Sequence, residues 1–472
     1  MTISQRPQPG EPRPYEFPST QRFTLGNGLR VIVAPMPRLP LVSILAVVDA
    51  GASGDAAGNE GLASLTAAAL AEGAAERDGP ALAEAFERLG TGLESGAGWD
   101  DATVQLTVTP ARLDDALALL ADVLMAPRFA DGDVARLKAE RLAELLQERV
   151  EPRGLADERF ARVVYDESSR YARSAGGTPR SVRALGVAQV RAWHDARYSG
   201  ATTTLIVTGD VTVERVRSLV ERRLGAWSRP VQPMAEVVVR GAGCGVVQGA
   251  GCGVDVGCGV RRVYVISKAD APQSELRIGH VGLPRAHGDY FATVVMNAVL
   301  GGLFGSRINL NLREVHAYTY GAHSAFDWRR AAGPFVVATA VKTEVTDAAV
   351  REILMEIDRI REAEVSMDEM ELATKYLGGV FPIRYETTGA VAGALAMANV
   401  YGLDDDYFGT YRDRIAAVTP ADVLAAARAH LHPDELQVLA VGDASAIEGP
   451  LAALQLGVLS VTNADDDEGA DA

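Results

Sequence analysis

The sequence predicts an α+β protein of two homologous domains, each an antiparallel-rich sheet covered by helices, arranged as a clamshell. Three landmarks recur along the 472 residues at nearly one offset. The offset is 232 residues for the first landmark and 233 for the other two, which indicates an internal duplication. The landmarks are "RVIV" at 30–33 with "RVYV" at 262–265, Val190 with Val423, and "VTGD" ending at Asp210 with "AVGD" ending at Asp443.

The predicted boundaries follow from the duplication and from composition. Eight glycines lie between residues 241 and 260, so this stretch is expected to be a flexible hinge between the domains. Proline and acidic residues at the two ends predict disorder there. The division is a disordered tail at 1–20, an N-terminal domain at 21–230, a Gly-rich linker at 231–260, a C-terminal domain at 261–460 and an acidic tail at 461–472.

The elements of the first half can be assigned in order. Residues 23–33 predict a hairpin, because Asn27-Gly28 favours the positive φ of a tight turn. Apolar runs at 42–51 and 202–210 predict strands. Helical patterns cover 60–75, 80–89, 111–126, 133–149 and 213–227, and Pro80 suits the first turn of its helix.

Charge and composition exclude several classes of partner. The formal net charge of −16 would repel phosphate backbones and anionic lipids, so we expect neither nucleic acid nor a membrane as a partner. The first residues, "MTISQRPQPGEPRPYEF", lack the apolar run of a signal peptide, and a cytoplasmic location is expected. Cys244, Cys252 and Cys258 lie in the Gly-rich linker at spacings that do not match paired C-x-x-C knuckles, which favours free thiols over a metal site.

Five longer segments follow one another in a fixed order. They are "LGNGLRVIV", "NEGLASL", "GTPRSVRALGVAQVRAWHDARY", "GGLFGSRINLNLREVHAYTYG" and "YLGGVFPIRYETTGAVAGALA". Together they resemble the insulinase/pitrilysin-type metallopeptidases, also called inverzincins, whose relatives include mitochondrial processing peptidase and the respiratory-chain core proteins. The resemblance spans about residues 20–450, and the ordered set is far more specific than any one segment.

The resemblance implies a zinc motif, H-x-x-E-H, on the helix that contains "EGLASLTAAALAEGA". Imidazoles at i and i+4 share one helix face and bind the metal, and the glutamate at i+3 activates water. In this sequence the corresponding positions are Ser64, Ala67 and Ala68, and no histidine precedes His194. We therefore expect no metal on this chain and no catalytic residue on it alone.

The resemblance also implies a third, distal zinc ligand near Glu144. Without the histidines, we interpret Glu144 as a solvated carboxylate on an amphipathic helix. One glutamate does not hold catalytic zinc, because useful affinity is shared over several ligands.

For the second domain, the resemblance implies a substrate-contacting arginine and tyrosine seven residues apart. Arg313 and Tyr320 have this spacing. An arginine offers a planar fork of donors to a carboxylate or carbonyl, and a tyrosine hydroxyl can stabilise an oxyanion. The alternative is a surface ion pair for Arg313 and a half-buried strand position for Tyr320. Of the nearby Tyr318, His316 and His323, two are expected to be ordinary packing or rim residues.

His430 and His432 stand two residues apart near a predicted helix end. This spacing does not place them on one helical face. We expect capping or surface roles for them rather than metal binding.

The interpretation is a non-catalytic subunit of a heteromeric zinc peptidase. Its partner would be a homologous subunit that carries zinc in an intact motif, and its substrate an unstructured peptide in a closed chamber. Three alternatives stay open: a peptide-binding or assembly scaffold, a homodimer, and a stand-alone enzyme with Ser64 as nucleophile. The last lacks a nearby histidine and a G-x-S-x-G elbow.

Overall fold

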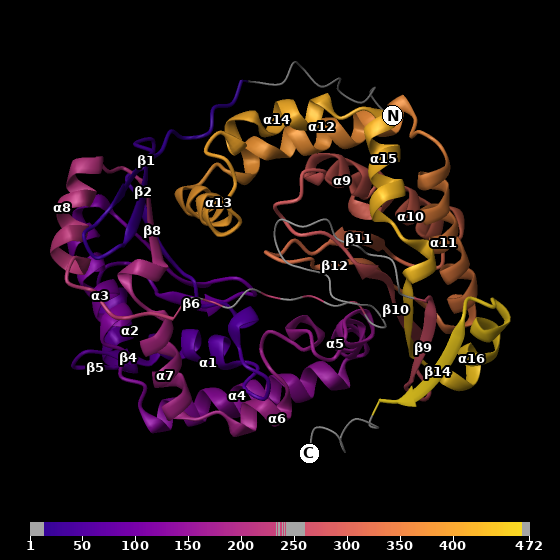
Figure 1. The fold of residues 1–472 in the computed structure, drawn as a ribbon, viewed down its shortest axis with the longest axis horizontal. Coiled ribbons are helices and arrows are strands. Elements are labelled where there is room, and N and C mark those ends of the chain that lie inside the picture. The colour runs from indigo at the N-terminus through magenta and orange to yellow at the C-terminus, as the bar shows by residue number, and fades with distance from the viewer. Residues whose placement is uncertain are drawn as a thin grey trace, which may run out of the picture.

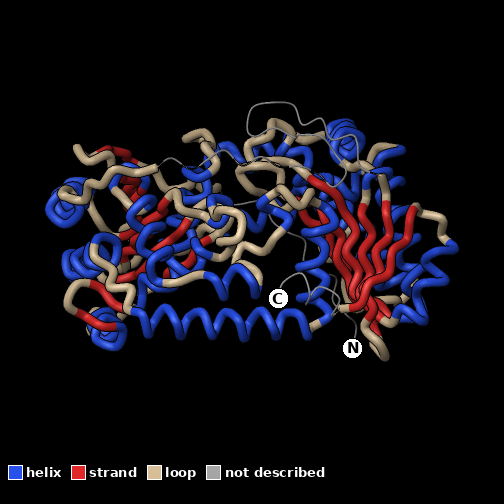
Figure 2. Tube along the Cα trace, turned by 60° about the horizontal axis from the view of Figure 1, so that its bottom comes forward, coloured by secondary structure: helices blue, strands red, loops and turns tan. Residues whose placement is uncertain are grey.

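The computed structural model describes residues 14–232 and 260–464, with Met234, Val237, Val239 and Gly241 between them. Its main strands form two six-stranded sheets, and helices cover both (Figures 1 and 2). The three cysteines and almost all of the predicted Gly-rich linker lie outside the described residues.

The first sheet has the strand order β1-β2-β8-β3-β7-β6. Strands β1 and β2 are antiparallel and joined by the predicted turn, where Gly28 has a φ of +87°. Strand β2 is parallel to β8, and the remaining neighbours are antiparallel. The strands are β1 (Gln21–Thr24), β2 (Arg30–Pro35), β3 (Val42–Val48), β6 (Glu94–Ala97), β7 (Ala102–Val108) and β8 (Thr203–Gly209).

The second sheet repeats this arrangement. Its order is β14-β9-β13-β10-β12-β11, so five strands of each sheet correspond in position and direction. "RVIV" and "RVYV" occupy the equivalent strands β2 and β9, which confirms the predicted duplication. The edge strand differs: β1 precedes β2 in the chain, whereas β14 comes from the C-terminal end. The strands are β9 (Arg262–Ser267), β10 (Gln273–Val281), β11 (Ala322–Phe326), β12 (Pro334–Lys342), β13 (Gln437–Gly442) and β14 (Val458–Asn463).

The helices also divide between the two halves of the chain. Those of the first half are α1 (Leu62–Ala69), α2 (Gly79–Glu87), α3 (Leu113–Met125), α4 (Asp131–Val150), α5 (Pro152–Val164), α6 (Pro179–Ala184), α7 (Val187–Arg197) and α8 (Val213–Leu224). Those of the second half are α9 (Tyr290–Asn297), α10 (Arg307–Asn309), α11 (Thr346–Glu362), α12 (Met367–Arg384), α13 (Thr388–Val400), α14 (Tyr407–Ala417), α15 (Pro420–His430) and α16 (Ala444–Ala453). The small β4 (Gly73–Ala74) and β5 (Arg77–Asp78) pair beside α2.

Two boundaries differ from the sequence predictions. The helix expected over 60–75 ends at Ala69, passes through a 3₁₀ turn and stops at Gly73, whose φ is +134°. The tail expected over 1–20 is too long, because Phe17 stacks on Phe408 with ring centroids 4.3 Å apart and Tyr15 packs on the second-domain core. Aromatic rings bury enough apolar area to fix an otherwise polar segment.

The C-terminal boundary also shifts. Residues 461–463 belong to β14 and not to the acidic tail, and the tail from residue 465 onward lies outside the described residues. One helical stretch, Tyr290–Val315, has the length and hydropathy of a membrane span, and half of its most apolar window is buried inside the second domain.

Each sheet buries one face under helices of its own half and the other under a helix of the opposite half. Figure 1 shows α13, in orange, beside the strands of the first sheet, and α5, in purple, beside those of the second. Alternating residues separate the two faces of a strand: Val31 and Val33 of β2 face the first core, whereas Ile32 and Ala34 face α13. We call this reciprocal covering of each sheet by a helix of the opposite half the exchange. It joins the two halves into one packed unit.

The contacts of α13 with the first sheet are apolar in the centre and polar at the start. Leu395, which is 4% exposed, packs with Ile32, Leu45 and Ile206. At the start of the helix, the Thr388 hydroxyl lies 2.8 Å from Ser43 Oγ.

The contacts of α5 with the second sheet match this pattern. Phe160 of α5 lies against Gly279, where a Cβ would come within 3.0 Å of its ring. Asp157 of the same helix accepts a hydrogen bond of 2.6 Å from Arg277. The predicted two-domain fold class is confirmed, and hinge opening of the halves stays a prediction.

A second joint between the halves is electrostatic. Arg330 of the second half lies 2.9 Å from Asp49 Oδ1, and its backbone N–H donates to Asp100 Oδ2 at 2.8 Å. Asp101 completes a group of three neighbouring carboxylates. Burial, reinforced by the charge of Asp100, raises the pKa of Asp101 to about 6.

Replacing Leu395 by Ala is expected to lower the free energy of unfolding by about 2–4 kcal/mol, because the substitution opens a cavity between α13 and the first sheet. Leu372→Ala on α12 is the matched control, since Leu372 is 51% exposed. Urea unfolding monitored by circular dichroism measures both. Equal losses in the two variants would contradict the packing described for α13.

Asp101→Asn is expected to stabilise the protein increasingly as the pH rises from 4 to 7. The native pKa of about 6 lies above the unfolded value of 3.8, so ionisation of Asp101 opposes folding above pH 4. The gain reaches at most about 3 kcal/mol for a shift of about two pKa units. Urea unfolding over this pH range provides the measurement, and an identical gain at pH 4 and pH 8 would assign the effect to something other than ionisation.

Candidate functional site

Helix α1 begins at a sharp, buried turn. Gly61, just before the helix, has a φ of +94°, and a Cβ there would come within 2.8 Å of Gly176 O. A non-glycine residue is therefore excluded by both conformation and space. The carboxylate of Asp55 caps the helix by accepting hydrogen bonds from the N–H groups of Gly61 (2.8 Å) and Ala63 (3.0 Å).

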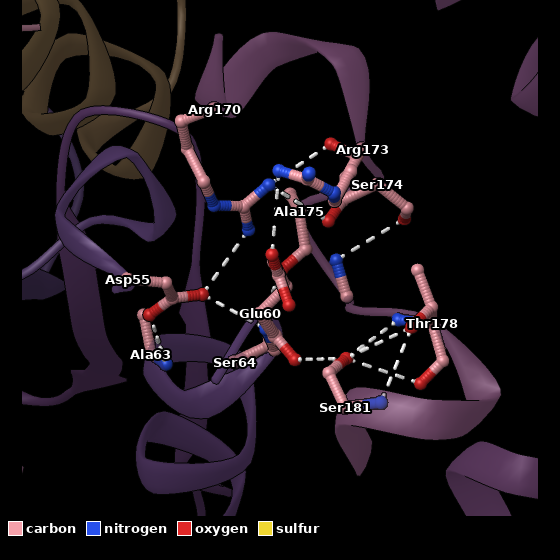
Figure 3. A network of polar contacts seen from close by, with 12 residues as sticks. Asp55, Glu60, Ala63, Ser64, Arg170, Arg173, Ser174, Ala175, Thr178 and Ser181 are labelled. Carbon is pink, nitrogen blue, oxygen red and sulfur yellow. Dashed lines mark hydrogen bonds and ion pairs between the residues drawn. The ribbon is translucent and has the colours of Figure 1, made fainter. Parts of the chain in front are cut away.

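A buried ion pair fixes this cap. Arg170 Nη2 lies 3.1 Å from Asp55 Oδ2, and the two side chains are 8% and 0% exposed (Figure 3). Arg170 Nη1 donates to the carbonyls of Arg173 and Ser174, and the guanidinium stands over Trp99. Burial raises the pKa of Asp55 to about 6, although Arg170 and the two backbone donors oppose the shift. The pair ties the start of α1 to the loop over residues 170–178.

Glu60 joins α1 to the same loop. Its backbone carbonyl accepts from Ser181 Oγ at 2.8 Å, and its buried carboxylate lies 3.5 Å from Arg173. Thr178 and Ser181 form a reciprocal capping box at the start of α6. Figure 3 shows these residues converging from the start of α1, the loop and the start of α6. The backbone beside the former zinc positions is held rigidly.

The three zinc-motif positions carry no ligand set. The Ser64 hydroxyl donates to Ala175 O at 3.3 Å. Ala67 is fully buried, and its carbonyl accepts from Ser95 Oγ of β6 at 2.7 Å. Ala68 is half-buried, one turn after Ser64. The hydroxyl of Ser64 is thus used by the backbone, which argues against its assignment as a nucleophile.

An arginine lies beside these positions. Arg141 of α4 donates from Nε to Gly176 O at 3.1 Å, next to the carbonyl that accepts from Ser64. Its Nη1 lies 3.0 Å from the carboxylates of both Glu144 and Glu148. Glu144, whose side chain is 63% exposed, is therefore paired with a guanidinium. A hydroxyl, two methyl groups and an ion-paired carboxylate do not fit catalytic zinc, which requires three protein N, O or S ligands.

A polar pocket of about 440 Å³ opens next to this arrangement. It lies between the end of α4, helix α5, the 170–178 loop and Arg329 of the second half. Arg329 stacks on Trp99 and Tyr171 at 4.3 and 4.5 Å from their ring centroids. The other charged residues in the lining are Glu148, Arg149, Asp157, Glu158, Arg162 and Arg173. The lining thus combines both signs of charge with the aromatic rings of Trp99 and Tyr171.

Arg313 and Tyr320 lie in the second half, on either side of a turn. Arg313 is in a π-helical segment, Leu310–Val315, and its guanidinium stands 4.2 Å over the ring of Phe304. Its Nη2 lies 3.5 Å from Glu314, and Nη1 has no hydrogen-bond partner among the described residues. Tyr320, just before β11, is 95% exposed. The half-buried strand position considered for Tyr320 is wrong.

The neighbouring candidates Tyr318, His316 and His323 occupy two places in the second half. His316 stacks on Tyr318 with centroids 4.9 Å apart and lies 3.7 Å from Glu352, so both rings pack on the domain surface. His323 is exposed on β11. Of the glycines in "GGLFGSR", Gly301 is required by packing, because a Cβ would come within 2.4 Å of Ser324 Oγ.

Comparison with known proteins gives the family. Residues 30–164 match the family model described as insulinase (peptidase family M16), and residues 184–377 match the one described as the peptidase M16 inactive domain. The chain is an insulinase-family peptidase homologue. The M16 assignment confirms the resemblance predicted from the five sequence segments.

Relatives of this M16 homologue agree over most of its length. An uncharacterized zinc protease of Streptomyces coelicolor is 23% identical over 87% of both chains. One from Mycobacterium tuberculosis is 24% identical over 86% of this chain and 90% of its own. A probable mitochondrial-processing peptidase subunit beta of Schizosaccharomyces pombe is 26% identical, over 60% of this chain and 59% of its own.

Solved structures share the fold of this M16 homologue. The peptidase M16 inactive domain from Pseudomonas fluorescens has a TM-score of 0.80 at 24% identity, covering 90% of this chain and 98% of that one. A protease from Helicobacter pylori has a TM-score of 0.81 at 16% identity, with 90% and 100% covered.

Three residues of the site were not predicted from the sequence: Asp55, Arg170 and Arg141. Asp55 lies six residues before Gly61 and Arg170 a further 109 residues away, so no local spacing indicates their pairing. Arg141 is one of several charged residues on α4, and only its contact with Gly176 distinguishes it. A charged residue three positions before "GNEGL" is the one sequence signal available for Asp55.

A variant of this M16 homologue with both Ser64→His and Ala68→His is expected to bind zinc poorly. The reason is that Arg141 forms an ion pair with the Glu144 carboxylate and places a positive charge beside the site. Adding Arg141→Ala is expected to tighten zinc binding by at least about tenfold. Competition with a chromogenic chelator measures the affinities. Arg136→Ala, another ion-paired arginine of α4, is the control. Equal affinities with and without Arg141 would contradict its role beside the site.

Proposed function

We propose that this chain is the non-catalytic subunit of a heteromeric zinc peptidase. In this proposal a homologous subunit carries the zinc, and this chain supplies Arg313 and Tyr320 to an unstructured peptide held in a closed chamber. The observation that carries the proposal is a division within one fold: α1 has no zinc ligand set, whereas Tyr320 projects 95% exposed from the second half.

The first part of the proposal concerns what the chain lacks. Hydrolysis of a peptide needs a metal-bound water or an equivalent nucleophile, and a general base typically contributes a factor of about 10²–10⁴ in rate. The positions that provide both in the family hold Ser64, Ala67 and Ala68 here. A chain that keeps the fold while lacking these groups needs a partner in order to act in proteolysis.

The second part concerns the surface around Arg313. Phe304 and Val315 are 72% and 73% exposed, and the Arg313 side chain, which stands over the Phe304 ring, is 32% exposed. Large exposed apolar side chains gathered on one surface mark binding sites in soluble proteins. An extended peptide would cover these side chains, accept from the guanidinium through a carbonyl, and place its scissile bond near the Tyr320 hydroxyl.

A second candidate function is a peptide-binding or assembly scaffold. The same exposed surface favours it, because burial of Phe304 and Val315 against a partner needs no chemistry. A homodimer is one form of this alternative, since homologous two-domain chains can pair with themselves. The two functions differ in whether Arg313 affects turnover or only association.

Reconstitution with a zinc-bearing homologue from the same organism tests the proposal. The isolated chain is expected to show no peptide hydrolysis, and the pair is expected to cleave an unstructured peptide. In the pair, Arg313→Ala is expected to lower kcat/KM by about 10²-fold or more with assembly unchanged, because a donor aimed at the developing charge is lost. Size-exclusion chromatography reports assembly, and a fluorogenic peptide reports turnover.

Arg351→Ala is the matched control, since Arg351 is an exposed arginine of α11 that pairs with Asp347 at 3.3 Å. It is expected to leave both turnover and assembly unchanged. Normal turnover in the Arg313→Ala pair would favour the scaffold. Metal-dependent hydrolysis by the isolated chain, abolished by Glu144→Gln, would overturn the proposal.

A further inference from the structure

Histidine side chains gather on the second half, far in sequence from the former zinc motif. His430 lies in the last turn of α15, which packs along α9. His287 and Asp289 come from the loop that leads into α9. The side chains of these three residues offer ligand atoms that all lie within 4.8 Å of one another. We call them the His287–Asp289–His430 triad.

Hydrogen bonds orient the triad for coordination. His430 Nε2 lies 2.7 Å from Asp289 Oδ2, and His287 Nδ1 lies 4.0 Å from the same oxygen. The backbone N–H of Asp289 donates to His287 Nδ1 at 3.1 Å, so this nitrogen is unprotonated, and a metal ion bound to its lone pair would replace this hydrogen bond. The two imidazole rings are 5.1 Å apart and nearly perpendicular. The rings thus meet edge to face, and each offers a nitrogen within 4.8 Å of the other ligand atoms of the triad.

Asp289 provides a second, independent observation. It occupies the position directly before α9, where an aspartate normally accepts a hydrogen bond from the first turn of the helix. Its side chain makes no such bond. The carboxylate is turned instead toward the two imidazoles, although this leaves a helix end without its usual cap.

A neighbouring histidine pair, His280 and His432, differs from the triad in what its imidazole nitrogens contact. His280 is buried, its Nδ1 donates to Val281 O at 2.7 Å, and its Nε2 accepts from the backbone N–H of His432 at 3.2 Å. Both nitrogens of His280 are thus used by the backbone, and its role is structural. In the triad, by contrast, His430 Nε2 bonds to the side chain of Asp289, and that side chain is 54% exposed.

We propose that the His287–Asp289–His430 triad binds a divalent transition-metal ion, with zinc as the expected occupant. Two imidazoles and one carboxylate form the borderline donor set that zinc takes up, whereas magnesium and calcium require oxygen ligands. Binding would replace the proton shared by His430 and Asp289, and water would complete the coordination. The ion would clamp the end of α15 to the start of α9. This inference is independent of the proposed peptidase role, because it concerns other residues and needs no partner.

Calorimetric titration of zinc into the full-length, tag-free and metal-stripped protein tests the proposal. One equivalent per chain is expected, with no heat from magnesium. His287→Ala, His430→Ala and Asp289→Asn are each expected to weaken binding at least about tenfold, because each removes a ligand. At a zinc concentration of about 100 times the wild-type Kd, the Tm is expected to rise by about 5 °C in the wild type and by no more than about half of that in the variants.

His323→Ala is the matched control, because His323 is an exposed histidine of β11 outside the triad. It is expected to bind zinc as the wild type does. X-ray absorption of the zinc-loaded protein should detect two imidazole ligands, and circular dichroism should show that each variant is folded. Absence of saturable binding, or unchanged affinity in folded His287→Ala and His430→Ala, would overturn the proposal.

Discussion

Reciprocal burial of the two sheets is the constraint on which this structure depends. Each sheet has two apolar faces, and the helices of its own half cover only one. The second face of the first sheet is covered by α13, and that of the second sheet by α5. Since apolar burial contributes about 25 cal/mol per Å², neither half reaches its full stability without the other. The exchange also fixes the joint at which the polar pocket and the 170–178 loop lie.

The start of α1, where the sequence predicts a degenerate zinc motif, is a tightly connected structural element. The cap on α1, the Asp55–Arg170 pair and the contacts of Arg141 connect one short helix to the loop beside it. None of these contacts needs a metal. The alanines of α1 give it high helix propensity and allow β6 to approach closely, so the helix contributes to packing.

Much of the fold was predictable because it rests on local patterns. The alternation in β2 and β9, the Asn27-Gly28 turn and the position of Pro80 all follow from short-range rules. Helix α5 and the exchange were not predicted, because pairing a helix with a sheet more than one hundred residues away is a non-local event. The prediction that α1 carries no zinc ligand set needed only the identities of the residues at the motif positions. The triad could be recognised only from the fold. The spacing of two residues argued against metal binding by His430 and His432, and His287 and Asp289 stand about 140 positions earlier in the sequence.

The exchange has a further consequence during synthesis. The first sheet is complete in sequence at Gly209, but α13, which covers its second face, ends only at Val400. A ribosome adds roughly 5–20 residues per second, so α13 is synthesised roughly 10–40 s after the first sheet is complete, and until then the second face of that sheet is uncovered. Over that interval the nascent chain presents Ile32, Leu45 and Ile206 to its surroundings. Biogenesis of this protein should therefore be sensitive to chaperones that bind apolar strands, and to pauses in translation ahead of residue 388.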